Sequence, residues 1–293
     1  MPDFSLFDYD QSAPLDIDVV AEQKRGAVTV QDIAYASPKF GKVTAYLVVP
    51  PGSGPFAGLL FVHWGQGNRE EFVDEAAALA ELGVVSLSID APHARPHHWR
   101  PQDQTPEAAL VVDIQLIVDM RRGLDLLLAR PDVDPERIGY VGHSLGATKG
   151  GILAAIDKRV RAYVLMGGAV SLTHNYRVST NPAIALYRDS IPTQEWEEFM
   201  MLLEPFDTAH YIAEAAPASL LFQFARNDEF ISEEEALLFE KLASEPKQTL
   251  WYACAHDFNE EARRDRVAWL TAQLSLAPSV ASVPDQSVSK ETL

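Results

Sequence analysis

The sequence predicts an α/β protein with a mostly parallel, doubly wound sheet of about eight strands. Short apolar runs alternate with helix-like segments from residue 58 to residue 274. This alternation indicates parallel strands, because parallel neighbours must be joined by crossover helices. The runs at 58–63 and 84–89 are apolar almost throughout, which is typical of strands that are covered on both faces.

The chain is expected to begin with an N-terminal arm over residues 1–26, which are polar, acidic and weakly patterned. Strands are predicted over 27–35 and 42–50, with a turn around residues 38–41. The connection between them is too short for a crossover helix. These two strands are therefore expected to form an antiparallel edge of the sheet.

Two helices are expected before the centre of the chain. The first is predicted to be capped by Asn68 and to end at Gly83. The second is predicted to start at Pro106 and to end before Pro131. Its apolar side chains recur at helical spacing and form one stripe, which comprises Leu110, Ile114, Ile117, Met120, Leu124 and Leu127.

The remaining strands are predicted over residues 137–141, 161–166, 219–224 and 248–254. A helix capped by Ser232 and Glu235, and a final helix over 259–274, separate or follow the last strands. No change in composition marks a second domain, so the sequence predicts one domain over 27–276.

Residues 168–217 form a long insertion that contains at least one helix, over 193–203. We expect this insertion to lie as a small helical lid over the strand ends. Residues 277–293 are rich in Ser, Val and Pro and are predicted to form a flexible C-terminal tail.

The strongest chemical signal is the segment Gly142-His143-Ser144-Leu145-Gly146, which lies between a predicted strand and a predicted helix. A G-x-S-x-G sequence in this setting is typical of a nucleophile elbow, a sharp turn that exposes its serine above a sheet. We therefore predict that Ser144 is a nucleophile. The alternative is a glycine-rich turn with an inert serine. His143 is expected to pack beside the turn, and Lys149 to reach solvent.

A serine hydroxyl needs a general base at neutral pH, and histidine is suited to that work. Among eight histidines, His256 alone follows the last predicted strand directly. Asp228 follows the preceding strand and is predicted to orient His256; Glu229 is the alternative. The chain order Ser144, Asp228, His256 is the one expected for successive loops of such a sheet.

An acyl-transfer intermediate carries an oxyanion, which is stabilised by two N–H donors. The backbone amide of Leu145 is predicted to be one donor. Trp64, in the loop that follows the third strand, is predicted to supply the other. Gly65 and Gly67 would allow this loop to pass close to a substrate, although glycine pairs also occur in ordinary turns.

Substrate contacts are predicted for residues in the same loops and in the insertion. They are His63, Gly65, Arg95, Trp99, Trp196 and Met200. The apolar side chains of the insertion could instead only pack it onto the body of the protein. His93, His97 and His98 lie close together, but the intervening prolines disfavour a zinc site, so no metal is expected.

These residues resemble those of the α/β-hydrolase fold family over roughly residues 27–275, and most closely its dienelactone-hydrolase-like and serine-peptidase-like esterases. The matching segments are His63-Trp64-Gly65, the elbow at 142–146, Asn227-Asp228 and Ala255-His256-Asp257-Phe258. The resemblance implies ester, thioester or amide cleavage through an acyl-enzyme without a metal or organic cofactor. Dienelactone hydrolases proper use a cysteine nucleophile. Ser144 therefore favours a carboxylesterase that acts on small to medium esters.

Composition narrows the choice of partners. The net charge of −18 over 293 residues disfavours nucleic acid and anionic membranes, which bind basic surfaces. A single cysteine, Cys254, excludes an internal disulfide. The N-terminus carries no leader pattern and no run of 18 apolar residues exists, so we expect a cytoplasmic protein with a small-molecule ester substrate.

Two alternatives remain at this stage. The same three catalytic residues could serve an exopeptidase or an acyl transferase, including a perhydrolase. A protein with this fold could also be a non-catalytic binder, because fold does not determine function. The sequence does not predict the oligomeric state.

Overall fold

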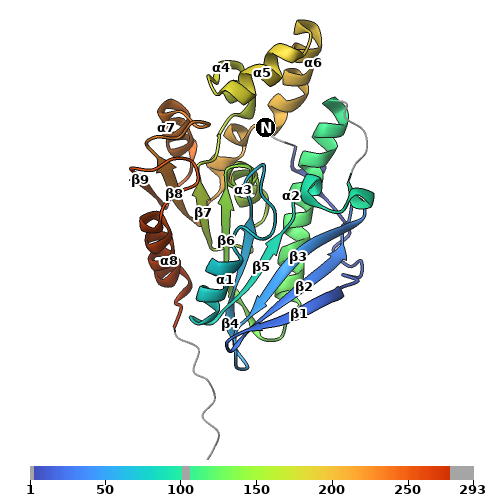
Figure 1. The fold of residues 1–293 in the computed structure, drawn as a ribbon, viewed down its shortest axis with the longest axis vertical. Coiled ribbons are helices and arrows are strands. Elements are labelled where there is room, and N and C mark those ends of the chain that lie inside the picture. The colour runs from blue at the N-terminus through green and yellow to red at the C-terminus, as the bar shows by residue number, and fades with distance from the viewer. Residues whose placement is uncertain (1–2, 101–105, 278–293) are drawn as a thin grey trace, which may run out of the picture.

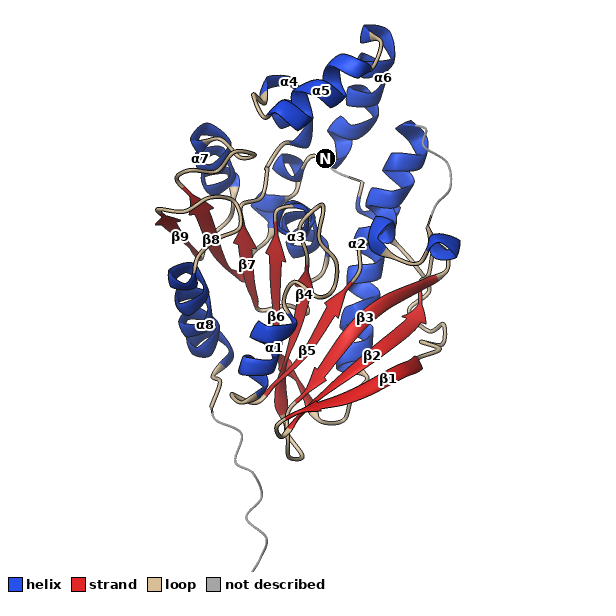
Figure 2. Cartoon of the chain, in the orientation of Figure 1, coloured by secondary structure: helices blue, strands red, loops and turns tan. Residues whose placement is uncertain are grey.

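The computed structural model describes residues 3–100 and 106–277 of the chain. Its centre is a nine-stranded sheet with the order β1-β2-β3-β5-β4-β6-β7-β8-β9. Strands β1 to β3 are antiparallel to their neighbours, and the strands from β5 to β9 pair in parallel. The predicted fold class is therefore confirmed, with one strand more than the sequence indicated; Figure 2 shows the sheet with its covering helices.

The extra strand is β1 (Asp18–Arg25), which lies in the segment predicted to be an arm. It pairs with β2 (Val28–Ala36), and β2 pairs with β3 (Lys42–Val49). Strand β1 left no pattern in the sequence, because all eight of its residues are exposed and its apolar residues do not alternate with polar ones. The arm also contains a short 3-10 helix, Phe4–Phe7, whose Phe7 is buried in the core.

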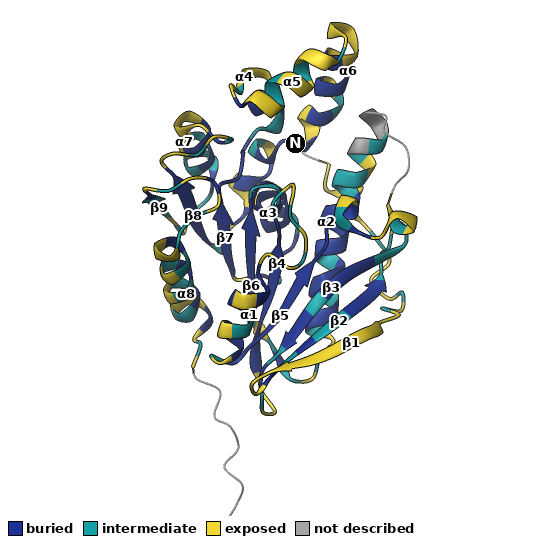
Figure 3. Cartoon of the chain, in the orientation of Figure 1, coloured by how far each residue is buried: buried dark blue, intermediate teal, exposed yellow. Residues whose placement is uncertain are grey.

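Most of the parallel strands are short and almost fully buried, whereas the last one, at the edge of the sheet, is mostly half-buried (Figure 3). Their bounds are β4 (Phe56–Val62), β5 (Val84–Ile89), β6 (Val133–His143), β7 (Ala162–Met166), β8 (Ser219–Ala225) and β9 (Lys247–Tyr252). Helices cover both faces of the sheet, because each face carries an apolar cluster that must be removed from water.

One face packs against α2 (Pro106–Leu128), α3 (Leu145–Ile156) and α7 (Glu233–Leu242). The opposite face packs against α1 (Val73–Ala80) and α8 (Glu260–Leu274). The helix α1 begins later than predicted: Asn68 caps a preceding turn by accepting from the Glu70 N–H. None of the helices among the described residues is both long and apolar enough to cross a membrane.

The insertion between β7 and β8 carries three α-helices, which are followed by three short 3-10 helices. The α-helices are α4 (Leu172–Val178), α5 (Pro182–Ser190) and α6 (Thr193–Leu203). Figure 1 shows them above the carboxyl ends of the central strands, where a lid was expected. The bounds of α6 agree with the predicted helix. The expected tail over residues 277–293 lies, apart from residue 277, outside the described residues.

Candidate active site

Ser144 lies on the turn between β6 and α3, with the backbone angles φ 51° and ψ −103°. A positive φ is rare for a residue with a β-carbon and marks a strained position. The turn is held by the Ser144 N–H, which donates to the Met166 carbonyl over 2.7 Å. This geometry presents the serine side chain at the amino end of α3.

The two glycines of the elbow are required by close backbone approaches. A β-carbon at Gly142 would lie 2.4 Å from the Gly146 carbonyl, and one at Gly146 would lie 2.2 Å from the Val62 carbonyl oxygen. Both distances are far below van der Waals contact. The G-x-S-x-G spacing therefore reflects packing between the turn, its own helix and β4.

His256 and Asp228 form a buried pair. The imidazole Nδ1 of His256 lies 2.9 and 2.8 Å from the two carboxylate oxygens of Asp228. Oδ1 of Asp228 also accepts the backbone N–H groups of Phe230 and Ile231, over 2.8 and 2.9 Å. The carboxylate is thus fixed by two amides. Since it only accepts hydrogen bonds, it selects the tautomer of His256 that carries its proton on Nδ1.

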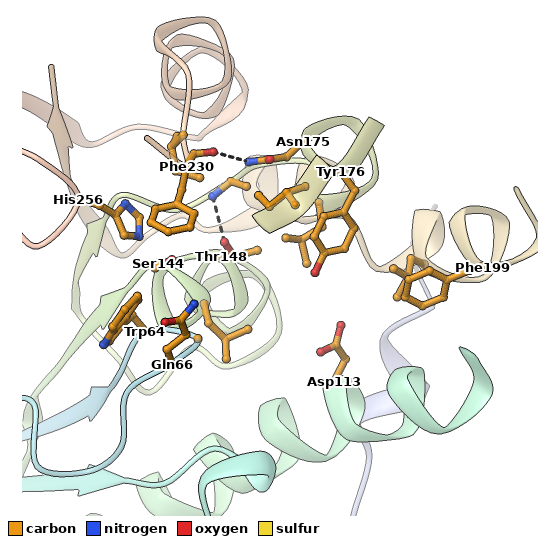
Figure 4. A pocket seen from close by; sticks show the side chains of 17 residues that line it. Trp64, Gln66, Asp113, Ser144, Thr148, Asn175, Tyr176, Phe199, Phe230 and His256 are labelled. Carbon is orange, nitrogen blue, oxygen red and sulfur yellow. Dashed lines mark hydrogen bonds between the residues drawn. The ribbon is translucent and has the colours of Figure 1, made fainter. Parts of the chain in front are cut away.

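That tautomer leaves a lone pair on Nε2 of His256. This atom is buried and has no hydrogen-bond partner among the described residues. Ser144 and His256 line the same cavity (Figure 4), although their side chains do not hydrogen-bond in this structure. Such contacts are often long before a substrate binds. The unpartnered Nε2 is therefore available to take a proton.

The cavity has a volume of about 300 Å³ and a mainly apolar wall. Its lining residues from the insertion and from the neighbouring loop are Ala169, Leu172, Asn175, Tyr176, Ile184, Phe199, Leu203, Phe230 and Ile231. A volume near the lower limit of known ligand pockets, roughly 300 Å³, fits a small or medium acyl group.

Among the predicted oxyanion donors, Leu145 lines the cavity and lies at the first position of α3. An N–H group there has no acceptor within the helix. Trp64, the other predicted donor, also lines the cavity, but in this structure its N–H donates to Oε2 of Glu71 over 2.9 Å. The following residues, Gly65 and Gln66, also line the cavity and provide the next amides of the same loop.

Glu71 connects the loops around the site. Its Oε1 lies 2.6 Å from Nδ1 of His143, and Nε2 of His143 lies 2.8 Å from the backbone oxygen of His256. The imidazole of His143 therefore lies between the Glu71 carboxylate and the loop that carries His256, and it links the two. The sequence predicted only a packing role for His143.

Several predicted substrate contacts lie away from the cavity. Arg95 is fully buried, and its guanidinium donates to Asp119 over 2.6 Å. Trp99 packs against Gly41 in the turn between β2 and β3. Trp196 and Met200 form an apolar cluster inside the insertion. The other two members of this cluster, Phe199 and Leu203, also line the cavity.

Of the other two predicted substrate contacts, Gly65 lines the cavity, whereas His63 does not. The ring of His63 is enclosed: Nδ1 donates to the Trp64 carbonyl over 2.6 Å, and Nε2 accepts the Ala91 N–H over 2.9 Å. Burial lowers the pKa of His63. The sequence could not distinguish these roles, because they depend on which way each loop side chain turns.

Comparison with solved structures identifies the fold. No family model matches the chain. The solved acetyl xylan esterase from Paenibacillus sp. R4 superposes with a TM-score of 0.78 at 18% identity and covers 92% of both chains. Acetyl xylan esterase 1 from Thermoanaerobacterium sp. JW/SL YS485 superposes with a TM-score of 0.74 at 15% identity. It covers 92% of this chain and 91% of its own. The chain therefore has the α/β-hydrolase fold, as the sequence predicted.

The chain is also similar in sequence to parts of other proteins. The bile acid-CoA:amino acid N-acyltransferase of Mus musculus is 30% identical over 200 residues, which are 68% of this chain and 42% of that protein. Acyl-coenzyme A thioesterase 5 of Mus musculus is 27% identical over 154 residues, 52% of this chain and 34% of its own length. The putative hydrolase YtaP of Bacillus subtilis is 27% identical over 187 residues, 54% of this chain and 59% of its own. The chain thus matches less than two thirds of each relative.

Proposed function

We propose that this protein is a serine hydrolase that cleaves small to medium carboxylic esters through an acyl-enzyme. The observation that carries the proposal is the strained Ser144 elbow beside an imidazole whose Nδ1 is held by Asp228 and whose Nε2 is unpartnered. The similar solved structures are esterases by name, which supports the same reaction class.

In the proposed mechanism, Oγ of Ser144 attacks the ester carbonyl while Nε2 of His256 takes its proton. Asp228 stabilises the imidazolium that forms. The oxyanion is bound by the Leu145 N–H and by an amide of Gly65 or Gln66, at the positive end of α3. His256 then protonates the leaving alcohol and activates water, which releases the acid.

Acyl transfer is the second candidate function, because two of the relatives act on acyl-CoA or transfer acyl groups by their names. The acyl-enzyme would then form from a thioester and be attacked by an amine instead of water. Incubating the protein with a short acyl-CoA, with and without glycine, separates the two: a hydrolase gives free acid in both cases, whereas a transferase gives the acyl-glycine. A peptidase or perhydrolase and a non-catalytic binder remain weaker alternatives.

The direct test is steady-state hydrolysis of p-nitrophenyl butyrate by the unmodified protein and by Ser144→Ala. Loss of the nucleophile is expected to lower kcat by several orders of magnitude, because triad residues act as a unit. Equal turnover by the two proteins would contradict the proposal. A cytoplasmic location and membership of the dienelactone-hydrolase-like branch stay predictions from the sequence.

A further inference from the structure

The end of the cavity away from His256 carries a charged side chain that the proposed mechanism does not use. Asp113 of α2 lines the cavity, and Figure 4 shows its carboxylate directed inward, toward the hydroxyl of Tyr176. Most other walls of the cavity are apolar. Desolvation of a carboxylate in such surroundings costs free energy unless a nearby group of opposite charge compensates it.

Compensation comes from Lys149 of α3, whose ammonium lies 2.5 Å from Oδ2 of Asp113. The Lys149 side chain is 1% exposed, whereas that of Asp113 is 20% exposed. Lys149 was expected to reach solvent; it is instead buried behind Asp113, five residues beyond Ser144 on the same helix. Asp113 therefore presents a neutralised but hydrogen-bond-accepting oxygen to the cavity.

The Asp113 carboxylate can accept more hydrogen bonds than it does in this structure. Among the described residues, Lys149 is the sole group that hydrogen-bonds to Asp113. The Tyr176 hydroxyl faces it across the cavity. Burial, and then the charge of Asp113, raise the pKa of Tyr176 to about 12. The tyrosine therefore remains a hydroxyl at neutral pH and can donate a hydrogen bond.

We propose that Asp113 and Tyr176 form a subsite for a hydroxyl group of the substrate, so that the enzyme prefers esters with a neutral hydroxyl at the end distant from the scissile carbonyl. A hydroxyl both donates and accepts. It can donate to Asp113 and accept from Tyr176 at the same time. An ammonium group offers only donors and would place a second cation beside the one carboxylate that already neutralises Lys149.

This inference rests on the proposed ester hydrolysis and names the substrate class of that same cavity. Its test compares matched pairs of esters by kcat/KM. The acyl pairs are p-nitrophenyl hexanoate, heptanoate and octanoate against their ω-hydroxy forms. The alcohol pairs are simple alkyl acetates against the monoacetates of the corresponding α,ω-diols. At least one hydroxyl form should exceed its alkyl partner by about 10- to 100-fold, because a buried polar site rejects the analogue that leaves it unpaired.

The double variant Asp113→Leu/Lys149→Met removes both charges together, since removing one would leave the other buried without a partner. It is expected to lower kcat/KM for the hydroxyl ester and to raise it for the alkyl ester, which reverses the preference. Tyr176→Phe, which removes a single oxygen, should reduce the preference several-fold even if the double variant does not fold. Glu136→Gln, in an exposed ion pair with Arg161, is the matched control and should keep the preference of the unmodified protein.

Three results would overturn the inference: no hydroxyl preference in either series, a larger preference for the corresponding ω-ammonium esters, or a hydroxyl preference that survives in both variants. The failure of this inference and that of the proposed function are distinguishable. If the esters are hydrolysed and Ser144→Ala abolishes the activity, the catalytic proposal stands whatever the preference at the distal end.

Discussion

The backbone N–H of Trp64 donates to the carboxylate of Glu71 over 2.9 Å. This bond fixes the loop after β4, and the other carboxylate oxygen of Glu71 lies 2.6 Å from His143 in the elbow. The same imidazole contacts the backbone oxygen of His256. One carboxylate and one imidazole therefore link three loops that carry the candidate catalytic groups.

We predict that Glu71→Gln lowers kcat by about tenfold, because hydrogen bonds to charged groups contribute roughly 1.5–3 kcal/mol and their loss loosens these loops. The measurement is steady-state hydrolysis of p-nitrophenyl butyrate. Glu70→Gln is the matched control, since Glu70 is exposed and adjacent in sequence. The linking role would be contradicted if both variants were equally active.

The role of Asp228 can be separated from that of its neighbour Glu229, the alternative left open by the sequence. Asp228→Asn preserves an oxygen for the Phe230 and Ile231 amides, but it no longer selects the Nδ1-protonated form of His256. We predict a fall in kcat of about 10⁴-fold, as is typical for loss of the orienting carboxylate. Glu229→Gln should be nearly as active as the unmodified protein. The reverse order of activities would assign the role to Glu229.

The elbow glycines should be intolerant of a β-carbon. Gly146→Ala would place a carbon 2.2 Å from the Val62 carbonyl oxygen, and we predict a loss of about 1–3 kcal/mol in the free energy of unfolding. Gly65→Ala is the control, since its β-carbon would have no atom within 4 Å. Chemical denaturation measures both. Equal stabilities would show that the elbow can relax around the extra carbon.

We predict that the buried His63 makes the free energy of unfolding depend on pH. Burial lowers its pKa in the folded protein, so the unfolded chain binds more protons as the pH falls below the ordinary histidine value of about 6.5. The contribution of His63 to stability is then complete above that value and declines as the pH falls toward its folded pKa. Denaturation curves across this range should show a smaller decline in His63→Gln. An identical pH dependence in the two proteins would contradict this assignment.

Much of the fold was predictable because buried strands and amphipathic helices differ in the spacing of their apolar residues. The apolar runs at β4 and β5 and the stripe along α2 marked their elements clearly. Strand β1 could not be predicted, because an exposed edge strand has no buried face to impose alternation. The start of α1 was also misplaced, since Asn68 caps a turn that precedes the helix.

The residues of the candidate site likewise include some that the sequence predicted and some that it did not. Ser144, Asp228 and His256 could be selected because their positions at successive strand ends follow from topology. The Glu71 carboxylate that takes the Trp64 amide, and the Asp113–Lys149 pair in the cavity, join residues distant in sequence through side-chain orientation. No local pattern encodes such contacts, so sequence reasoning missed both.

The central claim is that His256 activates the hydroxyl of Ser144 for covalent attack. The most direct measurement is the rate of labelling by a fluorophosphonate, followed by intact-protein mass spectrometry and mapping of the modified residue. We predict a single adduct on Ser144, none on Ser144→Ala, and labelling slowed by orders of magnitude in His256→Gln. Labelling of Ser144→Ala at the rate of the unmodified protein, or an adduct on another residue, would contradict the account.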